Sequence, residues 1–436
     1  MVLKASPAIY YAMKKSEIIL YSILLFLIVF NPPLLPGFSF TVLFVLMSIF
    51  LCLGNMKRIK SIFRDRSIKR LFKAFIVFFV YYAFTTIINF IVYEDDAILT
   101  GFITLTWTSM SFFLVTFAIV IIAQKKSMSM NNLCGLYVLA GFYQALIGLA
   151  CLINPSIKDI CNSMVISNSG SEYMRDIVSV TSAFRNFGLA STTYDIFGMS
   201  MSILAIASAK KGLEDGWVYY ILAGLISIVA IINARTSFFL IAVGLFFLTM
   251  SKKGESISVS RIFHKILVYS IFAFCALTIV FTVIKDTSTE QLLWLASAVE
   301  DATSLSGGEK TGYFDILFNE FLVFPSSIFS VLFGVGMSPA DAINHNSDVG
   351  YIQYLWLFGI VGSILYYRFY YILFRTARNN ASWPNNAFFL ATLWMTIIYL
   401  IKLTCLGYSM ASVIFGPLCI YSILRNEKVM GSSKFV

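Results

Sequence analysis

Long apolar runs alternate with short polar segments along almost the whole chain. Because about 20 residues at a rise of about 1.5 Å cross the hydrocarbon core of a bilayer, these runs predict membrane-spanning helices. We predict twelve spans, at residues 17–35, 38–54, 71–92, 101–123, 133–153, 193–209, 217–233, 236–250, 266–284, 351–373, 387–405 and 409–424. The pattern thus predicts an all-α polytopic integral membrane protein, with residues 1–436 forming a single transmembrane domain.

The composition agrees with this pattern. The chain is 59% hydrophobic and 12% charged, whereas a soluble globular protein has about 25% charged residues. No soluble domain of appreciable size remains once the apolar runs are removed. The first run continues to Phe30 with no small-x-small cleavage site after it. We therefore expect a retained first span rather than a cleaved signal peptide.

The positions of Lys and Arg predict which side of the membrane each loop faces. The segment 55–70, NMKRIKSIFRDRSIKR, is densely basic, and basic loops stay in the cytoplasm. Alternation of the spans then puts both termini and most of the 32 basic residues inside, and most of the 22 acids outside. The net charge of +10 therefore belongs to the cytoplasmic face and does not indicate nucleic-acid binding.

Three external segments follow from this orientation. One is short and acidic (93–100), one is a loop at 154–192, and the largest is a loop at 285–350. Within the largest loop, 291–302 and 311–322 have helical apolar spacing with acids between the apolar positions, which is typical of interfacial helices. We expect this loop to roof a site at the outer membrane boundary.

The seven cysteines do not indicate a metal site. Most lie in apolar runs, where cysteine behaves as a small hydrophobic residue. No CxxC or Cys/His ligand spacing is present. Cys151 and Cys161 are placed to meet near one external loop, although we favour two unpaired thiols over a disulfide there.

Three positive charges near the outer boundary are candidates for an anion site. Arg185 lies in AFRNFGLASTTYDIFG, Arg235 lies in the tight turn of INARTSFFL, and Lys402 lies near the outer end of the eleventh span. A cation beside hydrocarbon is costly to bury and usually has a partner, and Arg suits a bidentate grip on phosphate oxygens. The alternatives are snorkelling for Arg235 and Lys402 and an ordinary loop charge for Arg185.

A possible base lies at the end of the largest loop, in INHNSDVGY. His345 is one of only two histidines in the chain, and its ordinary pKa near 6.5 lets it accept a proton at neutral pH. Asp348 can orient His345, act as the base itself, or cap the helix that begins near Gly350. Asn344 and Asn346 suit sugar hydroxyls or turns.

These segments together form a pattern. Its parts, in order, are RNFG (185–188) after an external loop, an RTS turn (235–237), FGVG (333–336), and HN-SD-x-GY (345–351) running into FGIVG (358–362). The pattern resembles the O-antigen polymerase and ligase superfamily of bacterial polysaccharide assembly. No single motif is specific, but their order and their common side of the membrane are.

The resemblance implies a fold, a location and a reaction. It implies a metal-independent, cofactor-free glycosyltransferase of GT-C-like helical fold in the bacterial inner membrane. Such enzymes act at the periplasmic face on oligosaccharide repeat units carried by undecaprenyl pyrophosphate. The implied partners are these lipid-linked units, membrane lipid, and a chain-length regulator and flippase of lipopolysaccharide biosynthesis.

The resemblance also implies residue roles. Arg185 and Arg235, with Lys402, would bind the pyrophosphate leaving group, since a developing anion needs preorganised positive charge. Arg235 would also take part in catalysis, and His345 or Asp348 would deprotonate or orient the accepting hydroxyl. The sugars would be bound by Asn344, Asn346 and Tyr351.

Two alternatives to a polymerase remain. The SD-x-GY segment resembles polymerases, whereas a ligase would attach the finished polysaccharide to lipid A-core. A lipid-linked oligosaccharide flippase or other transporter would carry charges deep within its spans and an internal repeat. The sequence places only Lys402 well inside a span and contains no clear repeat, so we favour the polymerase.

Overall fold

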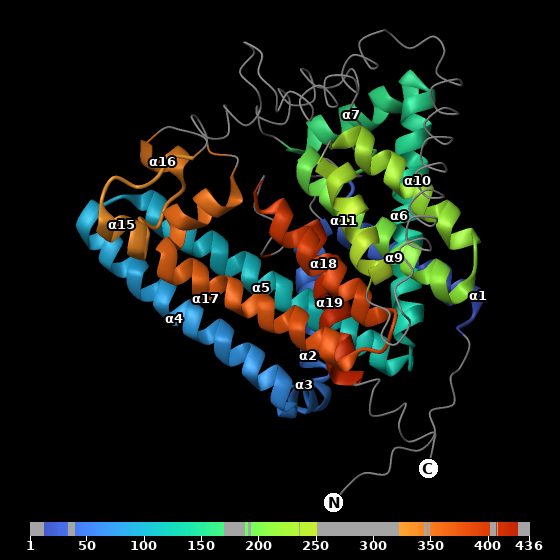
Figure 1. The fold of residues 1–436 in the computed structure, drawn as a ribbon, viewed down its shortest axis with the longest axis horizontal. Coiled ribbons are helices and arrows are strands. Elements are labelled where there is room, and N and C mark those ends of the chain that lie inside the picture. The colour runs from blue at the N-terminus through green and yellow to red at the C-terminus, as the bar shows by residue number, and fades with distance from the viewer. Residues whose placement is uncertain are drawn as a thin grey trace, which may run out of the picture.

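The fold is known from a computed structural model in which every regular element of the described residues is a helix (Figure 1). The structure describes residues 13–33, 40–169, 188–190, 193–234, 236–250, 322–343, 347, 349–401, 407 and 409–425. The helices of the first half are α1 (Lys15–Phe30), α2 (Phe40–Leu53), α3 (Met56–Arg64), α4 (Arg66–Tyr93), α5 (Asp96–Lys125), α6 (Met130–Ile153) and α7 (Pro155–Ser169). The helices of the second half are α9 (Tyr194–Asp215), α10 (Val218–Asn233), α11 (Thr236–Met250), α15 (Ile328–Phe333), α16 (Pro339–Ile343), α17 (Gly350–Asn380), α18 (Asn385–Tyr399) and α19 (Met410–Arg425).

Eleven of the twelve predicted spans fall in described parts of the chain, and each coincides with a helix. The twelfth, 266–284, lies outside the described residues, as do the predicted interfacial helices 291–302 and nearly all of 311–322. Within the described part, α4, α5, α6, α9 and α17 are long and apolar enough to cross a membrane. A sixth span results if α2 and α3, bent by 84° to each other, are counted as one. The chain is therefore a helical membrane protein, and the count of twelve spans stays a prediction.

Short polar residues between the apolar runs fix where several helices begin. The Asp65 carboxylate accepts hydrogen bonds from the backbone of Ser67 at 2.8 Å and Ile68 at 3.1 Å, at the start of α4. Asp95 caps α5 in the same way, and Ser129 caps α6. Each cap satisfies amide groups that have no partner inside the helix.

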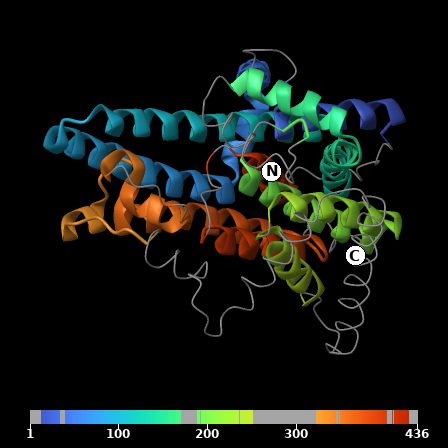
Figure 2. The ribbon, with the colours of Figure 1, turned by 90° about the horizontal axis from the view of Figure 1, so that it is seen from above.

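The helices pack as two groups joined by a central pair. In Figure 1, α4, α5 and α17 run side by side through one half, and α6, α9, α10 and α11 fill the other. Between the two groups, α18 packs on α11, α9 and α17, while α19 packs on α5, α9 and α17. Figure 2 shows the same bundle from above, with α5, α4 and α17 in successive layers.

Aromatic rings fill the contact between α4 and α17. The Phe78 ring lies 5.1 Å from Phe358 and 4.7 Å from Tyr366, centroid to centroid. Tyr82 is fully buried one turn further along, 4.9 Å from the same Phe358 ring. Edge and tilted contacts of this kind add about 0.5–1.5 kcal/mol per pair beyond area burial. The Phe-rich composition therefore serves packing between helices at this contact.

One end of the bundle, which we call the basic end, is built by α3 and by the C-terminal end of α5. The sequence predicts a loop at 55–70, but the structure forms α3 there and begins α4 at Arg66. The reason is the apolar spacing of Ile59, Ile62 and Phe63, which gives the segment one face to bury. Ile62 is buried, and the exposed cations are Lys57, Arg58, Lys60 and Arg64.

The opposite end, which we call the distal end, is where α4 leads to α5, α6 leads to α7, and α17 begins. The sequence predicts loops at 154–192 and 285–350; the structure places α7 in the first, and α15 and α16 in the second. In Figure 1, α15 and α16 lie close together on the left, and α7 lies apart from them at the top, above α6 and α11, with α3 at the bottom.

Candidate functional site

Tyr351 is the predicted site residue that the structure describes. The other predicted site residues lie outside the described residues: Arg185, Arg235, Asn344, His345, Asn346, Asp348 and Lys402. Their immediate neighbours in the chain are described in most cases, and these neighbours show how the segments that carry the site residues are held.

Tyr351 joins the start of α17 to the end of α18. Its backbone N–H donates to the carbonyl of Leu400 at 3.2 Å, and its hydroxyl donates to the carbonyl of Ile397 at 2.7 Å. These bonds satisfy carbonyl groups at the C-terminal end of α18. The chain that leaves Asp348 is thereby bonded to the chain that leads to Lys402. Tyr351, which we predicted to bind sugar, thus has its hydroxyl bonded within the protein.

The residues on either side of Asp348 make hydrogen bonds at the start of α17. The Ser347 hydroxyl accepts from the Val349 backbone at 3.3 Å, and the Ser347 carbonyl accepts from the Gln353 side chain at 2.6 Å. The N-cap position of α17 is Val349. Asp348 itself lies outside the described residues, so capping, orientation of His345 and catalysis all stay predictions for it.

The two glycine motifs of the pattern pack against each other. Gly334 of the FGVG segment and Gly359 of the FGIVG segment have φ angles of +83° and +66°, which favour glycine. A Cβ placed on Gly334 would lie 2.6 Å from the backbone nitrogen of Gly359. Only backbone fits at this crossing, so the two motifs act as one structural unit.

The same crossing interrupts α17. The non-helical angles of Gly359 free carbonyl groups in the turn before it. The Trp356 carbonyl accepts instead from the backbone of Val335 at 2.7 Å and of Gly336 at 3.2 Å. The Tyr81 hydroxyl of α4 lies 3.0 Å from the Phe358 carbonyl. A helix break at membrane depth needs such partners.

A small apolar cluster fastens the end of the large loop to the distal end. Its buried members are Ile98, Val335, Met337, Val349, Ile352 and Trp356. The Trp356 indole also donates to the carbonyl of Val323 at 2.8 Å, and the Asn89 amide of α4 donates to the Gly334 carbonyl at 3.2 Å. Residues 322–343 therefore lie against α4, α5 and α17, directly before the segment that carries His345.

A second group of contacts holds the segments next to Arg185 and Arg235. Gly188, with φ +57°, packs on α6 so closely that a Cβ there would lie 2.7 Å from the Gln144 side-chain nitrogen. Gly198 of α9 packs against the turn between α10 and α11, where a Cβ would lie 2.5 Å from the Ser237 hydroxyl and closer still to Ala234. Close packing at Gly188 and Gly198 thus holds the described neighbours of Arg185 and Arg235 against α6 and α9.

Helix α18 connects the two groups of contacts. It packs along α11, which begins directly after Arg235, and also along α17 and α9. At Gly244 of α11, a Cβ would lie 2.5 Å from the Ile206 side chain of α9 and 2.9 Å from the Met395 sulfur of α18. The helices next to the predicted site segments, which carry Arg185, Arg235, Asp348 and Lys402, therefore all contact one another through α18, α9 and α17.

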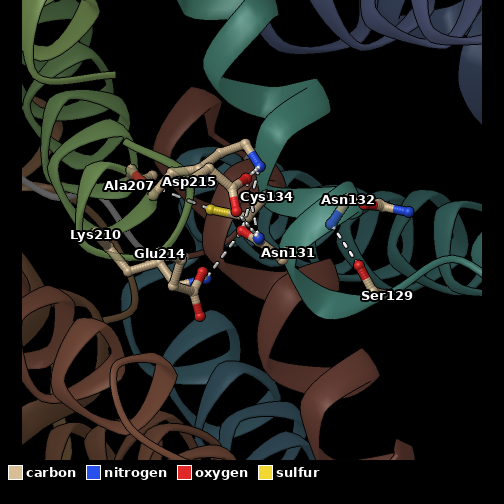
Figure 3. Close-up of polar contacts among 9 residues, drawn as sticks. Ser129, Asn131, Asn132, Cys134, Ala207, Lys210, Glu214 and Asp215 are labelled. Atoms are coloured by element: carbon tan, nitrogen blue, oxygen red, sulfur yellow. Dashed lines mark hydrogen bonds and ion pairs between the residues drawn. The ribbon is translucent and has the colours of Figure 1, made fainter. Parts of the chain in front are cut away.

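A charged cluster that the sequence did not predict lies between α6 and α9 (Figure 3). Lys210 is fully buried and pairs with Glu214 at 2.7 Å, and Lys211, also buried, pairs with Asp215. The Asn131 amide nitrogen donates to both Asp215 oxygens, at 3.0 and 3.1 Å. Its amide oxygen lies 3.5 Å from the Lys210 ammonium and 3.3 Å from the Lys211 ammonium.

The sequence contains the signal for this cluster. Our predicted spans end at 209 and resume at 217, which leaves KKGLEDG (210–216) as a loop, but α9 continues to Asp215. In KKGLED, each Lys precedes an acid by four residues, which is the spacing of ion pairs on one helix face. Gly135 of α6 makes room for the cluster, because a Cβ there would lie 2.8 Å from the Lys211 side chain.

The fold defines the class of this chain as a multi-pass helical membrane protein, several of whose helices are long enough to cross a bilayer. The chain matches no protein-family model and no curated protein sequence. The chain's own residues and their packing therefore carry the functional conclusion.

Proposed function

We propose that the chain is an O-antigen polymerase, a metal-independent membrane glycosyltransferase with twelve spans and a GT-C-like fold. It transfers the growing polysaccharide from undecaprenyl pyrophosphate onto the non-reducing end of the next lipid-linked repeat unit. The reaction takes place at the distal end, which faces the periplasm in this proposal because the opposite end carries the basic residues of α3.

The observation that carries the proposal is the contact between Gly334 and Gly359. These glycines belong to the two motifs that flank HN-SD-x-GY in the sequence, and a Cβ on Gly334 would come within 2.6 Å of the Gly359 nitrogen. The flanking motifs are thus packed together, with Tyr351 bonded to the end of α18 beside them. Such packing is expected of a segment held in place for chemistry.

The residues suit the proposed step. The accepting hydroxyl attacks the anomeric carbon of the donor, and the bond from that carbon to the pyrophosphate oxygen breaks. His345 or Asp348 takes the hydroxyl proton, while Arg185, Arg235 and Lys402 stabilise the charge that develops on the leaving pyrophosphate.

The acceptor sugars are bound by neighbouring side chains. Asn344 and Asn346 offer amide groups to sugar hydroxyls. The Tyr351 hydroxyl is bonded to Ile397, so Tyr351 contributes through its ring and through the position it gives to the start of α17. It is therefore a positioning residue in this proposal.

The test is genetic. The gene is deleted in its host, and the lipopolysaccharide is separated on a gel after complementation with the native gene, with Arg235→Ala or with Arg378→Ala. Arg378 is an exposed arginine in the last turn of α17, away from the distal end, and serves as the matched control. We expect deletion to leave core bearing a single repeat unit, and Arg378→Ala but not Arg235→Ala to restore the ladder at equal expression.

Other outcomes distinguish the alternatives. If the deletion strain shows bare core without a single-repeat band, the chain is not a polymerase, and a ligase or a flippase becomes the interpretation. A ligase leaves polymerised lipid-linked polysaccharide on the periplasmic face, whereas loss of a flippase leaves lipid-linked units on the cytoplasmic face. A full ladder from Arg235→Ala contradicts the proposed anion site.

A transporter is the second candidate, and one observation favours it. Lys210 and Lys211 are buried in α9, a helix long enough to span the membrane, and ionisable residues inside spans often mark transport pathways. Each of these lysines is paired with an acid, which is also how a structural cluster is built. Transport of a lipid-linked oligosaccharide into vesicles that contain the purified protein would favour this candidate over the polymerase.

A further inference from the structure

Two thiols meet where α6 turns into α7. Cys151 lies in the last turn of α6 and Cys161 lies in the second turn of α7. Their sulfur atoms are 3.5 Å apart, and both side chains are buried, with 1% and 5% of their surface exposed. The turn between them is fixed by Asn154, whose side-chain oxygen accepts from the Ser156 backbone at 2.9 Å. The two cysteines are therefore held as neighbours by the local fold.

This geometry is close to that of a covalent bond. The sulfur atoms of a disulfide are about 2.05 Å apart, so these two need to approach by only about 1.5 Å. The other thiols with a described contact point elsewhere: Cys52 lies 4.0 Å from the Leu114 carbonyl, and Cys134 lies 3.8 Å from the Ala207 carbonyl. In the part of the chain that the structure describes, thiol-to-thiol contact belongs to Cys151 and Cys161.

The surroundings act on the two thiols in opposite directions. The hydrogen bond from Cys151 and burial raise the pKa of the Cys161 thiol. Lys158, on the same helix as Cys161, is half buried near Cys151, and a nearby cation favours the thiolate that attacks a disulfide. The pair lies at the distal end, opposite the basic residues of α3, and by the positive-inside rule that end faces the oxidising side of the membrane.

We propose that Cys151 and Cys161 form an intramolecular disulfide, made by a protein thiol–disulfide oxidant of the extracytoplasmic space. One cysteine thiolate attacks the disulfide of the oxidant, forming a mixed disulfide and releasing one oxidant thiol. The second cysteine thiolate attacks the mixed disulfide and releases the other oxidant thiol. Two electrons and two protons pass from the cysteine pair to the oxidant, which leaves as a dithiol.

The bond would fasten α7 to the bundle. Helix α7 buries Cys161 and Val165 toward α6 and exposes Ile157 and Ile160. The contact of α7 with the bundle is thus narrow, and a covalent link at Cys161 reinforces it. The chain leaves α7 at Ser169 toward Arg185 in the sequence, so the bond anchors the helix from which that segment continues. This inference does not depend on the glycosyltransferase proposal.

Mass spectrometry of the full-length protein tests the bond. Cells are treated with N-ethylmaleimide before lysis, and the protein is purified in detergent without reductant and digested with trypsin. Because Lys158 lies between the two cysteines, cleavage separates them into peptides 127–158 and 159–175. We expect these peptides to remain joined, two hydrogens lighter than their sum, and to separate after reduction.

Three variants identify the partners. Peptide 127–158 also contains Cys134, so Cys134→Ser is the matched control and must keep the linked peptide. Cys151→Ser and Cys161→Ser must each abolish it. Because the digest is read from denatured protein, a variant of lowered stability still gives a result.

Two results overturn the proposal. The first is alkylation of both Cys151 and Cys161 in the native protein before any reductant is added. The second is linkage of either cysteine to a different one. The lipopolysaccharide ladder reports on the glycosyltransferase separately, so a missing disulfide and a missing polymerase activity are told apart.

Discussion

Gly334 and Gly359 are packed so closely that neither can carry a side chain. They are 25 positions apart in the sequence and belong to different segments, yet a Cβ on Gly334 would lie 2.6 Å from the Gly359 nitrogen. Both residues have positive φ angles. The break in α17 and the path of the chain from α15 toward α16 thus depend on the same contact.

Substitution of Gly334 tests this contact. Gly334→Ala adds a methyl group against backbone atoms and strains a residue at φ +83°. The strain alone costs about 1–3 kcal/mol, and the clash adds to it. We expect a clear fall in the thermal unfolding temperature of the purified protein in detergent.

Gly224→Ala is the matched control for that experiment. Gly224 lies in α10, and a Cβ there meets nothing within 4 Å. Because Ala favours a helix over Gly by about 1 kcal/mol, this variant should be as stable as the native protein or more so. Equal unfolding temperatures for the two variants would contradict the close contact.

Gly198→Ala should disturb the turn that carries Arg235 without touching a charged group. The added methyl group would meet Ala234 and would lie 2.5 Å from the Ser237 hydroxyl, so the turn must move away from α9. In complemented cells, we expect the polysaccharide ladder to weaken more than the amount of folded protein does.

Ala234→Gly provides the rescue for Gly198→Ala. It removes the Cβ that the new methyl group meets, so the double variant should regain part of the ladder. A double variant no better than Gly198→Ala, or a full ladder from Gly198→Ala alone, would show that the position of this turn does not limit activity.

Tyr351→Phe removes one hydrogen bond and leaves the ring in place. The bond from the hydroxyl to the Ile397 carbonyl is 2.7 Å long, and losing a bond of this kind costs about 1 kcal/mol. We expect a small drop in the unfolding temperature and a reduced but visible ladder. Tyr371→Phe, at a half-exposed ring of α17, is the control and should change neither. Complete loss of activity with unchanged stability would instead assign the hydroxyl to the sugar.

The buried lysine cluster predicts strong coupling between Lys210 and Glu214. Lys210→Met leaves the Glu214 carboxylate without its partner at 2.7 Å. Since about a quarter of the Glu214 side chain is exposed, we expect a loss of about 2 kcal/mol rather than the about 3–5 kcal/mol of a fully buried pair. Glu214→Gln together with Lys210→Met should recover part of the loss.

The exposed pair Lys126–Glu17 is the control for the comparison of single and double variants at Lys210 and Glu214. Its atoms are 2.8 Å apart, but the two side chains are 42% and 31% exposed. Breaking it should lower stability much less than breaking the Lys210–Glu214 pair, because solvent screens an exposed ion pair. Single and double variants of each pair give the coupling energy between its two residues in unfolding measurements. If the Lys210–Glu214 and Lys126–Glu17 coupling energies are equal, the burial of Lys210 contributes nothing to the strength of its pair.

Local sequence pattern was enough to place most helices, because each apolar run must satisfy its own backbone groups within the membrane. It failed at α3, α7, α15, α16 and the last turn of α9, which are helical although they were assigned to loops. Two of them, α3 and α7, are helical for a different reason, which is burial of one narrow face against a neighbouring helix. Ile62 of α3 and Cys161 of α7 are buried in this way.

Less of the candidate site than of the fold could be predicted from the sequence. The motifs around Gly334 and Gly359 were noticed, but their mutual contact joins distant positions that no local periodicity relates. Tyr351 was predicted to bind sugar, and the bond from its hydroxyl to the Ile397 carbonyl, 46 residues away, has no signal in the local sequence. The pairs of Lys210 and Lys211 were visible as four-residue spacings, whereas their burial depends on Asn131 and Gly135 of another helix.

The interruption of α17 has a mechanical consequence. The carbonyl groups at the break are bonded by donors from outside the helix: Trp356 by the backbone of Val335 and Gly336, and Phe358 by the Tyr81 hydroxyl of α4. A helix break whose carbonyl groups have no hydrogen-bond donors can flex as a hinge. The carbonyl groups at this break are hydrogen-bonded to two other segments. We therefore expect the start of α17, the part of α4 around Tyr81 and residues 333–337 to move together rather than to bend at the break.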